Sequence, residues 1–302
     1  MRVMKFLRLM VGLMFATAFA VTAWAEPEVV ALREIVAEQK AALAVAKAAE
    51  DESVLEDHRP RLQKVVNRYE ALLTKYPDFA AGWASYGLFL CDPLLDERRA
   101  GLSLLLRANG MDPDLAVVKN QIGVLMAEEG RVVDALNYFL AASDLEPSEP
   151  LYHFQIGLLL DEAKESFLKT KAWKRGKLET DMLAAFARAT TLAPERVDFA
   201  YRAAEAYYGL ETPKWDEAYT AWSRLEERLV GRNETQVARL HRARVRWQQG
   251  YAGVARELLA SVDAPALRAQ TVKLAEEFDA EDRAEAKAAA EAAATRASSE
   301  AR

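Results

Sequence analysis

The sequence predicts an all-α protein, a right-handed superhelical α-solenoid built from antiparallel helix hairpins. Three observations predict it. A pattern of small, turn-forming and aromatic residues recurs along the chain, and prolines follow the helical stretches at similar intervals. Ala, Leu, Glu and Arg, which are good helix formers, are abundant. A hairpin of this kind cannot bury its apolar face alone, so the hairpins must stack into an array.

Residues 1–25 have the composition of a secretory signal peptide. Three basic side chains precede an apolar run over residues 9–21, and Ala23 and Ala25 place small residues before a cut in front of Glu26. A retained membrane anchor is the alternative, although the run is short for a span of about 20 residues. We therefore expect a periplasmic or secreted protein, exported through a cleaved N-terminal signal peptide of bacterial character.

The net charge limits the class of partner, and the cysteine count limits how the fold can be stabilised. Removal of the signal peptide takes away three positive charges, so the formal net charge changes from −6 to −9. We expect no nucleic-acid partner, because nucleic-acid binding needs a basic face. Cys91 is the single cysteine, so no intrachain disulfide can form and stability must come from packing.

The first segment after the cut, residues 26–59, is expected to hold an amphipathic helix and an acidic linker. The apolar residues between Pro27 and Lys47 recur at spacings of three, four and seven residues, which is typical of a helix. Acidic residues then interrupt the pattern. Helices resume at Pro60 and end at Pro77, because proline cannot continue a helix.

The hairpin from Ala116 to Glu149 shows the recurring pattern most completely. A small residue in the first helix and another in the second let the two backbones approach, and large residues fill the space between neighbouring hairpins. The residues that carry the pattern are Ile122, Gly123, Gly130, Ala135, Phe139, Ala142, Leu145 and Pro147.

This pattern resembles the tetratricopeptide repeat (TPR) family, whose 34-residue unit is a pair of antiparallel helices. The resemblance covers about residues 60–265, with hairpins near 80–115, 116–149, 150–196, 197–232 and 233–265. The second helix of the third hairpin arrives 13 residues late, and the first helix of the fifth carries four arginines. Another α-solenoid is the alternative. Residues 266–302, rich in Ala, Glu and Arg, are expected to be a frayed helix or disordered.

The sequence offers no catalytic, metal-binding or cofactor-binding constellation. His58, His153 and His241 are far apart, no Gly-rich phosphate loop is present, and Cys91 has no evident partner base. We therefore expect no cofactor and no enzyme activity, and we keep an unrecognised helical active site as an alternative.

The resemblance implies a concave groove, lined by positions 2, 5, 9, 12 and 13 of each first helix. These positions hold no Lys or Arg, which departs from family members that clamp a terminal carboxylate. An apolar or aromatic segment with basic flanks is the implied ligand; alternatively, a neighbouring helix, such as the one from Pro27, seals the groove. The candidate groove residues are Val117, Asn120, Val124, Leu151, Phe154, Leu158, Asp161, Asp198, Tyr201, Glu205 and Tyr208.

The insertion in the third hairpin, from Lys164 to Thr180, is locally basic and aromatic. It is a candidate contact for an acidic partner or for anionic lipid headgroups, so peripheral membrane contact stays open. An extended hairpin with solvated lysines is the alternative. The candidate patch consists of Lys169, Lys171, Trp173, Lys174, Arg175 and Lys177.

Together these observations predict a non-catalytic scaffold or adaptor of the bacterial cell envelope that binds another envelope protein or a peptide segment. The alternative is a structural component that self-associates or attaches to the membrane surface. The sequence leaves the oligomeric state open.

Overall fold

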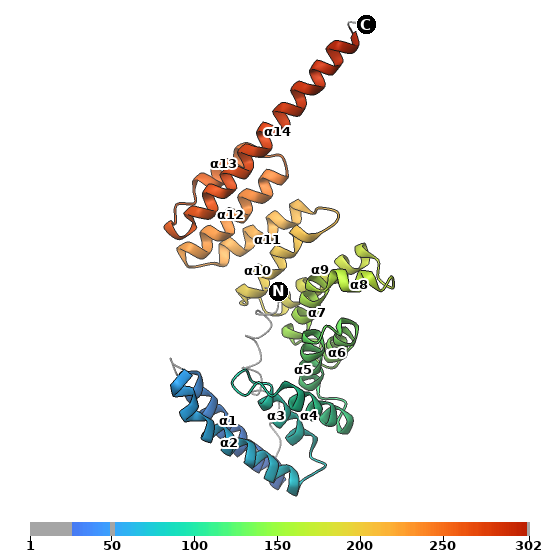
Figure 1. Cartoon of the computed structure of the whole chain (residues 1–302), viewed down its shortest axis with the longest axis vertical. Helices are drawn as coiled ribbons and strands as arrows, with labels where there is room; N and C mark the ends of the chain where they lie inside the picture. Colours follow the sequence, from blue (N-terminus) through green and yellow to red (C-terminus); the bar gives the residue numbers. More distant parts are fainter. Residues whose placement is uncertain (1–25, 49–51, 301–302) are drawn as a thin grey trace. The chain divides into compact units, whose positions relative to one another are not determined.

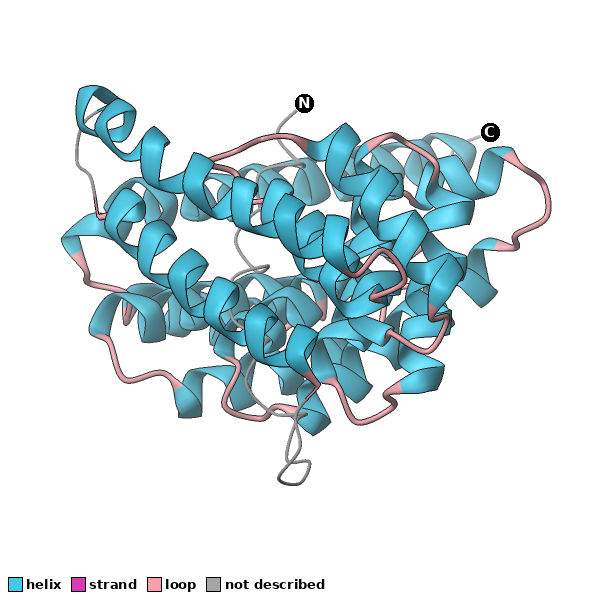
Figure 2. Cartoon of the chain, turned by 90° about the horizontal axis from the view of Figure 1, so that it is seen from below, coloured by secondary structure: helices cyan, strands magenta, loops and turns pink. Residues whose placement is uncertain are grey.

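The computed structural model describes residues 26–48 and 52–300, except for the side chains of 52–58, 295 and 297–300. The predicted signal peptide lies outside these residues. Within the described ranges every regular element is a helix (Figure 2). The chain divides into two compact units, Met1–Lys174 and Arg175–Arg302, and each is described by itself (Figure 1).

The first unit is a succession of helix hairpins. Its helices are α1 (Pro27–Lys47), α2 (Glu52–Lys75), α3 (Ala80–Leu90), α4 (Arg98–Met111), α5 (Ala116–Glu128), α6 (Val132–Leu145), α7 (Pro150–Glu162) and α8 (Lys164–Lys169). Helix α1 packs against α2, α3 against α4, and α5 against α6. Helix α7 packs on α6, and the short α8 packs on both.

Small residues allow the helices of a hairpin to approach closely, as predicted. A Cβ atom added to Gly101 of α4 would lie 2.9 Å from the carbonyl oxygen of Gly87 in α3. In the next hairpin, a Cβ atom on Gly123 would lie 2.7 Å from the ring of Phe139. Gly130 forms the turn between α5 and α6 with a φ of 77°, a conformation that favours glycine. The predicted packing of the 116–149 hairpin is confirmed.

The N-terminal segment differs from the expected helix and linker. Helix α1 has the predicted bounds, but α2 begins at Glu52, so the acidic residues expected to form a linker up to residue 59 belong to a helix. Pro60 lies inside α2 and does not begin it. Ile35 of α1 and Val65 and Tyr69 of α2 share one buried cluster, and this packing outweighs the helix-breaking effect of a single proline.

The second unit contains α9 (Arg175–Leu192), α10 (Val197–Glu205), the 3₁₀ helix η3 (Ala206–Gly209), α11 (Trp215–Arg228), α12 (Arg232–Gln248), α13 (Ala252–Ala260), the 3₁₀ helix η4 (Pro265–Leu267) and α14 (Arg268–Glu300). Helix α10 packs on α9 and α11, and α12 packs on α11 and α13. These contacts repeat the hairpin arrangement of the first unit.

The predicted third hairpin spans the boundary between the two units. Its two expected helices are α7 and α9, and the boundary between the units falls between them, at Lys174. The insertion supplies α8 instead, and Phe167 of α8 is fully buried. Because α8 covers apolar surface of α6 and α7, it performs in the first unit the packing expected of the later helix.

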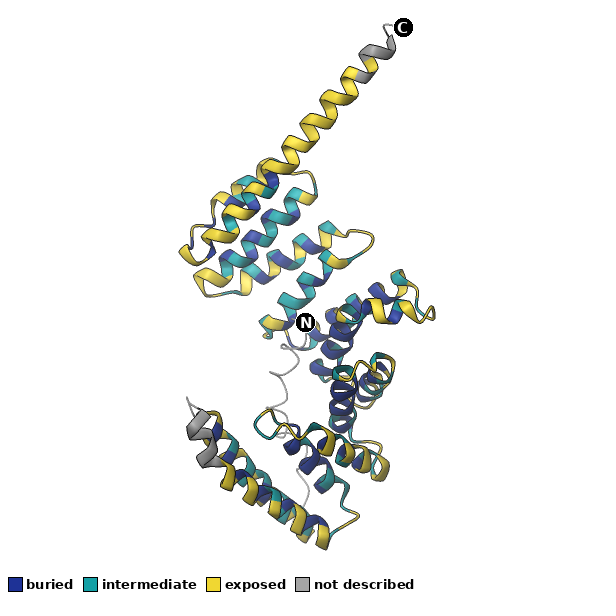
Figure 3. Cartoon of the chain, viewed as in Figure 1, coloured by how far each residue is buried: buried dark blue, intermediate teal, exposed yellow. Residues whose placement is uncertain are grey.

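The C-terminal tail, expected to be a frayed helix or disordered, is helical from Arg268 to Glu300. Leu274 and Phe278 of α14 are buried against the α12–α13 hairpin, and the Phe278 ring stacks on Trp247 at 4.1 Å. Beyond these residues, positions 279–294 and 296 of α14 are exposed (Figure 3). Two apolar residues four positions apart lie on the same helix face, so even this narrow stripe fixes the first half of α14.

Candidate partner-binding surface

The candidate groove residues of the first unit lie on α5 and α7 and are mostly buried. Phe154 is 8% exposed, and Asn120, Val124, Leu151 and Leu158 are also buried. Val117 and Asp161 are partly exposed. In this arrangement the apolar residues belong largely to the core, so they offer a partner little surface. Helix α1, the suggested cover, packs against α2 and α3.

Two buried polar side chains of the first unit are incompletely hydrogen-bonded. The Oδ1 atom of Asn120 on α5 and the Oε1 atom of Gln155 on α7 are inaccessible to solvent, and neither accepts a hydrogen bond within the described part of the chain. A buried acceptor without a donor costs about 1–3 kcal/mol. Apolar packing therefore does not explain why α5 and α7 carry Asn120 and Gln155 at buried positions.

The candidate groove residues of the second unit are at the surface and lie together. Tyr201 on α10 and Tyr208 on η3 are partly exposed, and both contact His241 of α12. The Tyr201 hydroxyl lies 3.3 Å from His241 Nε2, and the Tyr208 hydroxyl lies 3.1 Å from Nδ1. The imidazole stacks on Trp222 with 4.0 Å between ring centroids. These four rings form what we call the aromatic cluster.

The environment of the aromatic cluster keeps His241 neutral. Burial, helped by the positive charge of Arg244, lowers the pKa of His241 from its ordinary 6.5 to about 4. Burial also raises the pKa values of Tyr201 and Tyr208. At neutral pH the cluster is thus an uncharged aromatic surface with hydroxyl groups that both donate and accept hydrogen bonds.

Sequence reasoning identified two members of the aromatic cluster and missed the other two. Tyr201 and Tyr208 were found from the repeat register. His241 was set aside because no other histidine lies near it in sequence, and Trp222 was not among the candidate residues. Their partnership depends on how α11 and α12 meet. One feature of the sequence could have indicated this contact: His241 lies on the predicted first helix of the hairpin that follows the one with Tyr201 and Tyr208.

The acidic candidates are paired with basic residues of the same chain. Asp198 lies 2.7 Å from Arg196, and this guanidinium holds the pKa of Asp198 below its usual value although burial opposes the shift. Glu205 lies 3.6 Å from Arg202. In the first unit, Asp161 lies 3.7 Å from the buried Lys164. The acidity expected of the groove is therefore partly neutralised within the chain.

The candidate basic patch falls into two parts. In the first unit Lys169, Lys171 and Lys174 are exposed, and Trp173 is half-buried with its ring 5.1 Å from that of Phe167. In the second unit Lys177 pairs with Asp181 at 2.5 Å, and Arg175 lies 3.8 Å from Glu179. Three lysines thus remain as candidate contacts, at the end of α8 and in the loop that follows it, where the Trp173 ring packs on Phe167 of α8.

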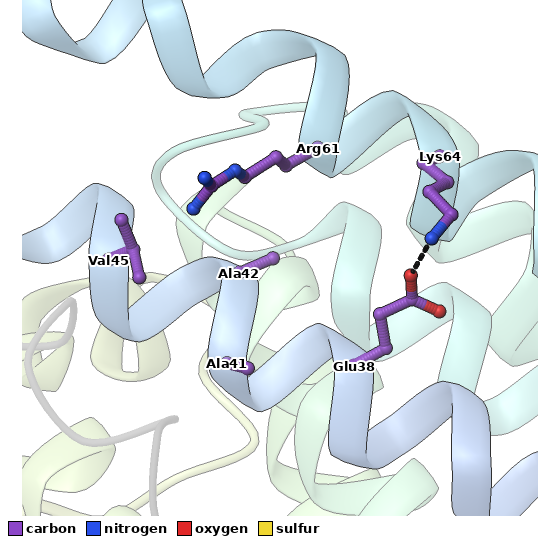
Figure 4. A pocket seen from close by; sticks show the side chains of 6 residues that line it. All are labelled: Glu38, Ala41, Ala42, Val45, Arg61 and Lys64. Carbon is purple, nitrogen blue, oxygen red and sulfur yellow. Dashed lines mark ion pairs between the residues drawn. The ribbon is translucent and has the colours of Figure 1, made fainter.

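A pocket between α1 and α2 was not anticipated (Figure 4). Ala41, Ala42 and Val45 form its apolar part, and Arg61 points across it. Its carboxylate, Glu38, is already engaged by Lys64 and by Arg68, each at 2.6 Å. The pocket contains no acid–base pair or nucleophile that would indicate a reaction.

The described residues provide little reactive chemistry. No group of three His, Cys, Asp or Glu side chains within them is arranged to hold a metal ion. Burial raises the pKa of Cys91 to about 12, so its thiol stays protonated and unreactive. No helix of the described part is long and apolar enough to cross a membrane.

Comparison with solved structures identifies the fold. YrrB, described as a TPR protein with an unusual peptide-binding site, aligns with a TM-score of 0.55 at 13% identity over 69% of this chain and 97% of its own. PilW, described as a widely conserved type IV pilus biogenesis factor, aligns at 0.53 and 13% over 80% and 98%. Pseudomonas aeruginosa PilF aligns at 0.53 and 15% over 83% and 99%.

At these identities the likeness shows the fold alone. The chain has the fold of tetratricopeptide repeat proteins, which confirms the predicted resemblance and the predicted all-α solenoid of helix hairpins. No protein-family model matches the sequence, and no curated protein matches it.

Proposed function

We propose that this protein is a non-catalytic scaffold of the bacterial cell envelope, which binds a segment of another protein on the first helices of its hairpins. The observation that carries the proposal is the aromatic cluster: Tyr201 and Tyr208 occupy register positions that line a groove, and both are partly exposed. Aromatic side chains with a polar end are favoured contact residues in protein interfaces, because they bury a large area at small entropic cost.

Two further observations support the scaffold and its location. YrrB, with the same fold, is described as binding peptide, and PilW is described as a factor in type IV pilus biogenesis. Residues 1–25 have the composition of an export signal. An exported chain without a convergent catalytic set in its described part is best suited to bind another envelope protein.

The proposed partner segment is apolar or aromatic with a basic residue nearby. Its apolar part would pack on the rings of Tyr201 and Tyr208, and its basic residue would compete with Arg202 for Glu205. The Arg202–Glu205 separation of 3.6 Å is long for an ion pair and partly exposed, so exchange of its cation costs little. The pairing of Asp198 with Arg196 makes that carboxylate a weaker candidate.

Affinity capture from an envelope extract tests the proposal, with residues 26–302 as bait. The substitution Glu205→Arg reverses one charge beside the aromatic cluster and should reduce capture of the partner at least about tenfold. Glu217→Arg is the matched control, because Glu217 is exposed on α11, the second helix of the same hairpin. Capture that both variants retain would overturn the groove assignment.

The oligomeric state separates the scaffold from the structural alternative. If the bait enriches only its own copies and its mass in solution corresponds to a defined oligomer, the protein self-associates and the scaffold proposal fails. A fourth bait, with Lys169, Lys171 and Lys174 changed to Gln, tests whether the exposed lysines contribute. Substitution is preferable to deletion of the insertion, because deletion would remove the fully buried Phe167.

A further inference from the structure

Three arginines lie in line on one face of α12. Arg239, Arg242 and Arg246 are spaced by three and four residues, so their side chains leave the same side of the helix. In the repeat register they occupy the positions that fill the space between neighbouring hairpins. The equivalent residues of α7 are His153, Ile156 and Leu160. The fifth hairpin thus places three cations where apolar or neutral packing is expected.

The arginines face two residues of α11. Glu226 accepts hydrogen bonds from Arg239 Nε at 2.9 Å and from Arg242 Nη1 at 2.6 Å. Arg242 Nη2 donates to the Tyr219 hydroxyl at 2.6 Å. One carboxylate therefore serves two guanidinium groups, and its side chain is only 11% exposed.

Arg246 is held without a carboxylate partner. Its guanidinium lies 3.6 Å from the ring centroid of Tyr219 and 5.1 Å from that of Tyr251. Its Nη1 atom donates to Gln249 at 3.0 Å, and Gln249 in turn donates to Asp216 at 2.6 Å. Among the described residues no carboxylate forms an ion pair with Arg246. Three guanidinium groups are thus opposed by only two carboxylates, that of Glu226 and, through the Gln249 amide, that of Asp216.

Two hydrogen-bond donors of this arginine cluster also lack an acceptor. The Nε atoms of Arg242 and Arg246 are buried and have no acceptor in the described part of the chain. A buried donor on a charged group is costly when it lacks a partner. The local field is positive as well: although burial raises the pKa of Tyr219, the hydrogen bonds from Arg242 and Arg246 lower it to a net value below the ordinary one.

We propose that Arg242 and Arg246, with Tyr219 and Tyr251, bind one carboxylate from an Asp or Glu side chain of a protein partner. The planar guanidinium fork matches a carboxylate, and a partly buried site strengthens the attraction. A single negative charge balances the single excess positive charge, whereas a phosphate dianion exceeds it. The net negative charge of the whole chain disfavours a long polyanion such as nucleic acid. Tyr251 is 54% exposed, so solvent reaches the outer wall of the site.

This site goes beyond the proposed groove, since it is built from α11, α12 and Tyr251, which precedes α13, and uses none of the groove residues. Its test uses the full chain labelled with ¹⁵N-arginine, whose Nε–Hε resonances are followed by NMR at neutral pH and constant ionic strength. The probe is a blocked peptide of three glutamates, and a peptide of three glutamines is the uncharged control. We expect the glutamate peptide to shift the Arg242 and Arg246 resonances saturably.

Substitutions separate recognition from folding. Arg246→Gln should weaken binding of the glutamate peptide by about tenfold or more, and Arg246→Lys should also weaken it, because lysine keeps the charge but loses the fork. Arg256→Gln is the control: Arg256 on α13 is partly exposed and already balanced by Asp279 and Asp282, at 2.8 and 2.7 Å, so binding should not change. Circular dichroism checks that each variant is folded.

Three results would overturn the proposal. The first is the absence of a saturable shift in the wild-type chain, a result that does not depend on any variant. The second is an equal shift with the glutamine peptide. The third is binding of inorganic phosphate without binding of the glutamate peptide, which would assign the site to a different oxyanion.

Discussion

Acidification should destabilise the second unit through His241. In the folded chain the imidazole stacks on Trp222 and lies between the hydroxyls of Tyr201 and Tyr208, where burial and Arg244 lower its pKa to about 4. In the unfolded chain the pKa returns to the ordinary 6.5. Between these two pH values the unfolded state binds a proton that the folded state does not, so stability present above pH 6.5 is lost as the pH falls towards 4.

The magnitude follows from the two pKa values. Between pH 8 and pH 5 the unfolded state gains about 2 kcal/mol relative to the folded state, and at pH 4 the difference reaches about 3 kcal/mol. At pH 4 the folded state is half protonated, and further acidification adds less than about 0.5 kcal/mol from His241. Because other carboxylates begin to titrate below pH 5, the interval from pH 8 to pH 5 isolates the histidine best.

Urea unfolding of the wild type and of His241→Phe, followed by circular dichroism at pH 8 and pH 5, measures this contribution. Phenylalanine keeps an aromatic ring against Trp222 but cannot be protonated. The free energy of unfolding of the wild type should fall by about 2 kcal/mol more than that of the variant. A direct NMR titration of the imidazole checks the pKa. Equal losses in both proteins would refute the reasoning.

Three further predictions concern stability, each measured by urea unfolding. Gly101→Ala should lower the free energy of unfolding by about 1–3 kcal/mol, because the new Cβ would lie 2.5 Å from Cys91 Sγ. Gly110→Ala on the same helix is the control and should be neutral or stabilising, because the space around Gly110 is open. Gly130→Ala should cost about 1 kcal/mol because of its φ of 77°; an unchanged stability would show that the turn relaxes. Phe278→Ala should cost about 3 kcal/mol and release α14 to hydrogen exchange, whereas Val272→Ala, at a half-exposed side chain, should do neither.

The hairpin architecture could be predicted from sequence because its determinants are local. In the 116–149 hairpin, the spacing of Ala135, Phe139 and Ala142 places them on one face of a helix, and all three are buried. Gly130 between two apolar stretches indicated the turn, and the structure gives it a positive φ. Such residues specify the hairpin whatever neighbours it has.

Features that depend on which helices meet could not be predicted in the same way. The insertion was noticed for its lysines, yet its structural effect comes from Phe167 of α8, whose side chain is fully buried. Leu274 and Phe278 dock α14, but two apolar residues in an alanine-rich helix give no strong periodic signal. The contact between His241 and Trp222 joins helices whose crossing is not encoded by either helix alone.

The candidate groove residues also show what the sequence can predict, which is their place in the repeat, and what it cannot predict, which is their burial. Repeat register predicts which positions turn towards one face, and it assigned Tyr201 and Tyr208, which both contact His241, to the same groove. It cannot predict the exposure of those positions, because exposure depends on side chains from other helices. Phe154 and Tyr201 occupy the same register position, yet Phe154 is buried and Tyr201 is partly exposed. The groove assignment of both units stays a prediction.

Helix α12 carries candidate binding residues at positions where it packs on its neighbours. Binding of a ligand at these residues should therefore change the stability of the fold. His241 and the three arginines occupy places where large apolar side chains would stabilise the stack more. A ligand that supplies the missing acceptor to Arg246, or that covers the aromatic cluster, binds the folded unit and not the unfolded chain. At a concentration one hundred times its dissociation constant, such a ligand stabilises the fold by about 2.7 kcal/mol. A true partner should therefore raise the unfolding temperature of the wild type, and Arg246→Gln should reduce that rise if the partner uses the arginine site.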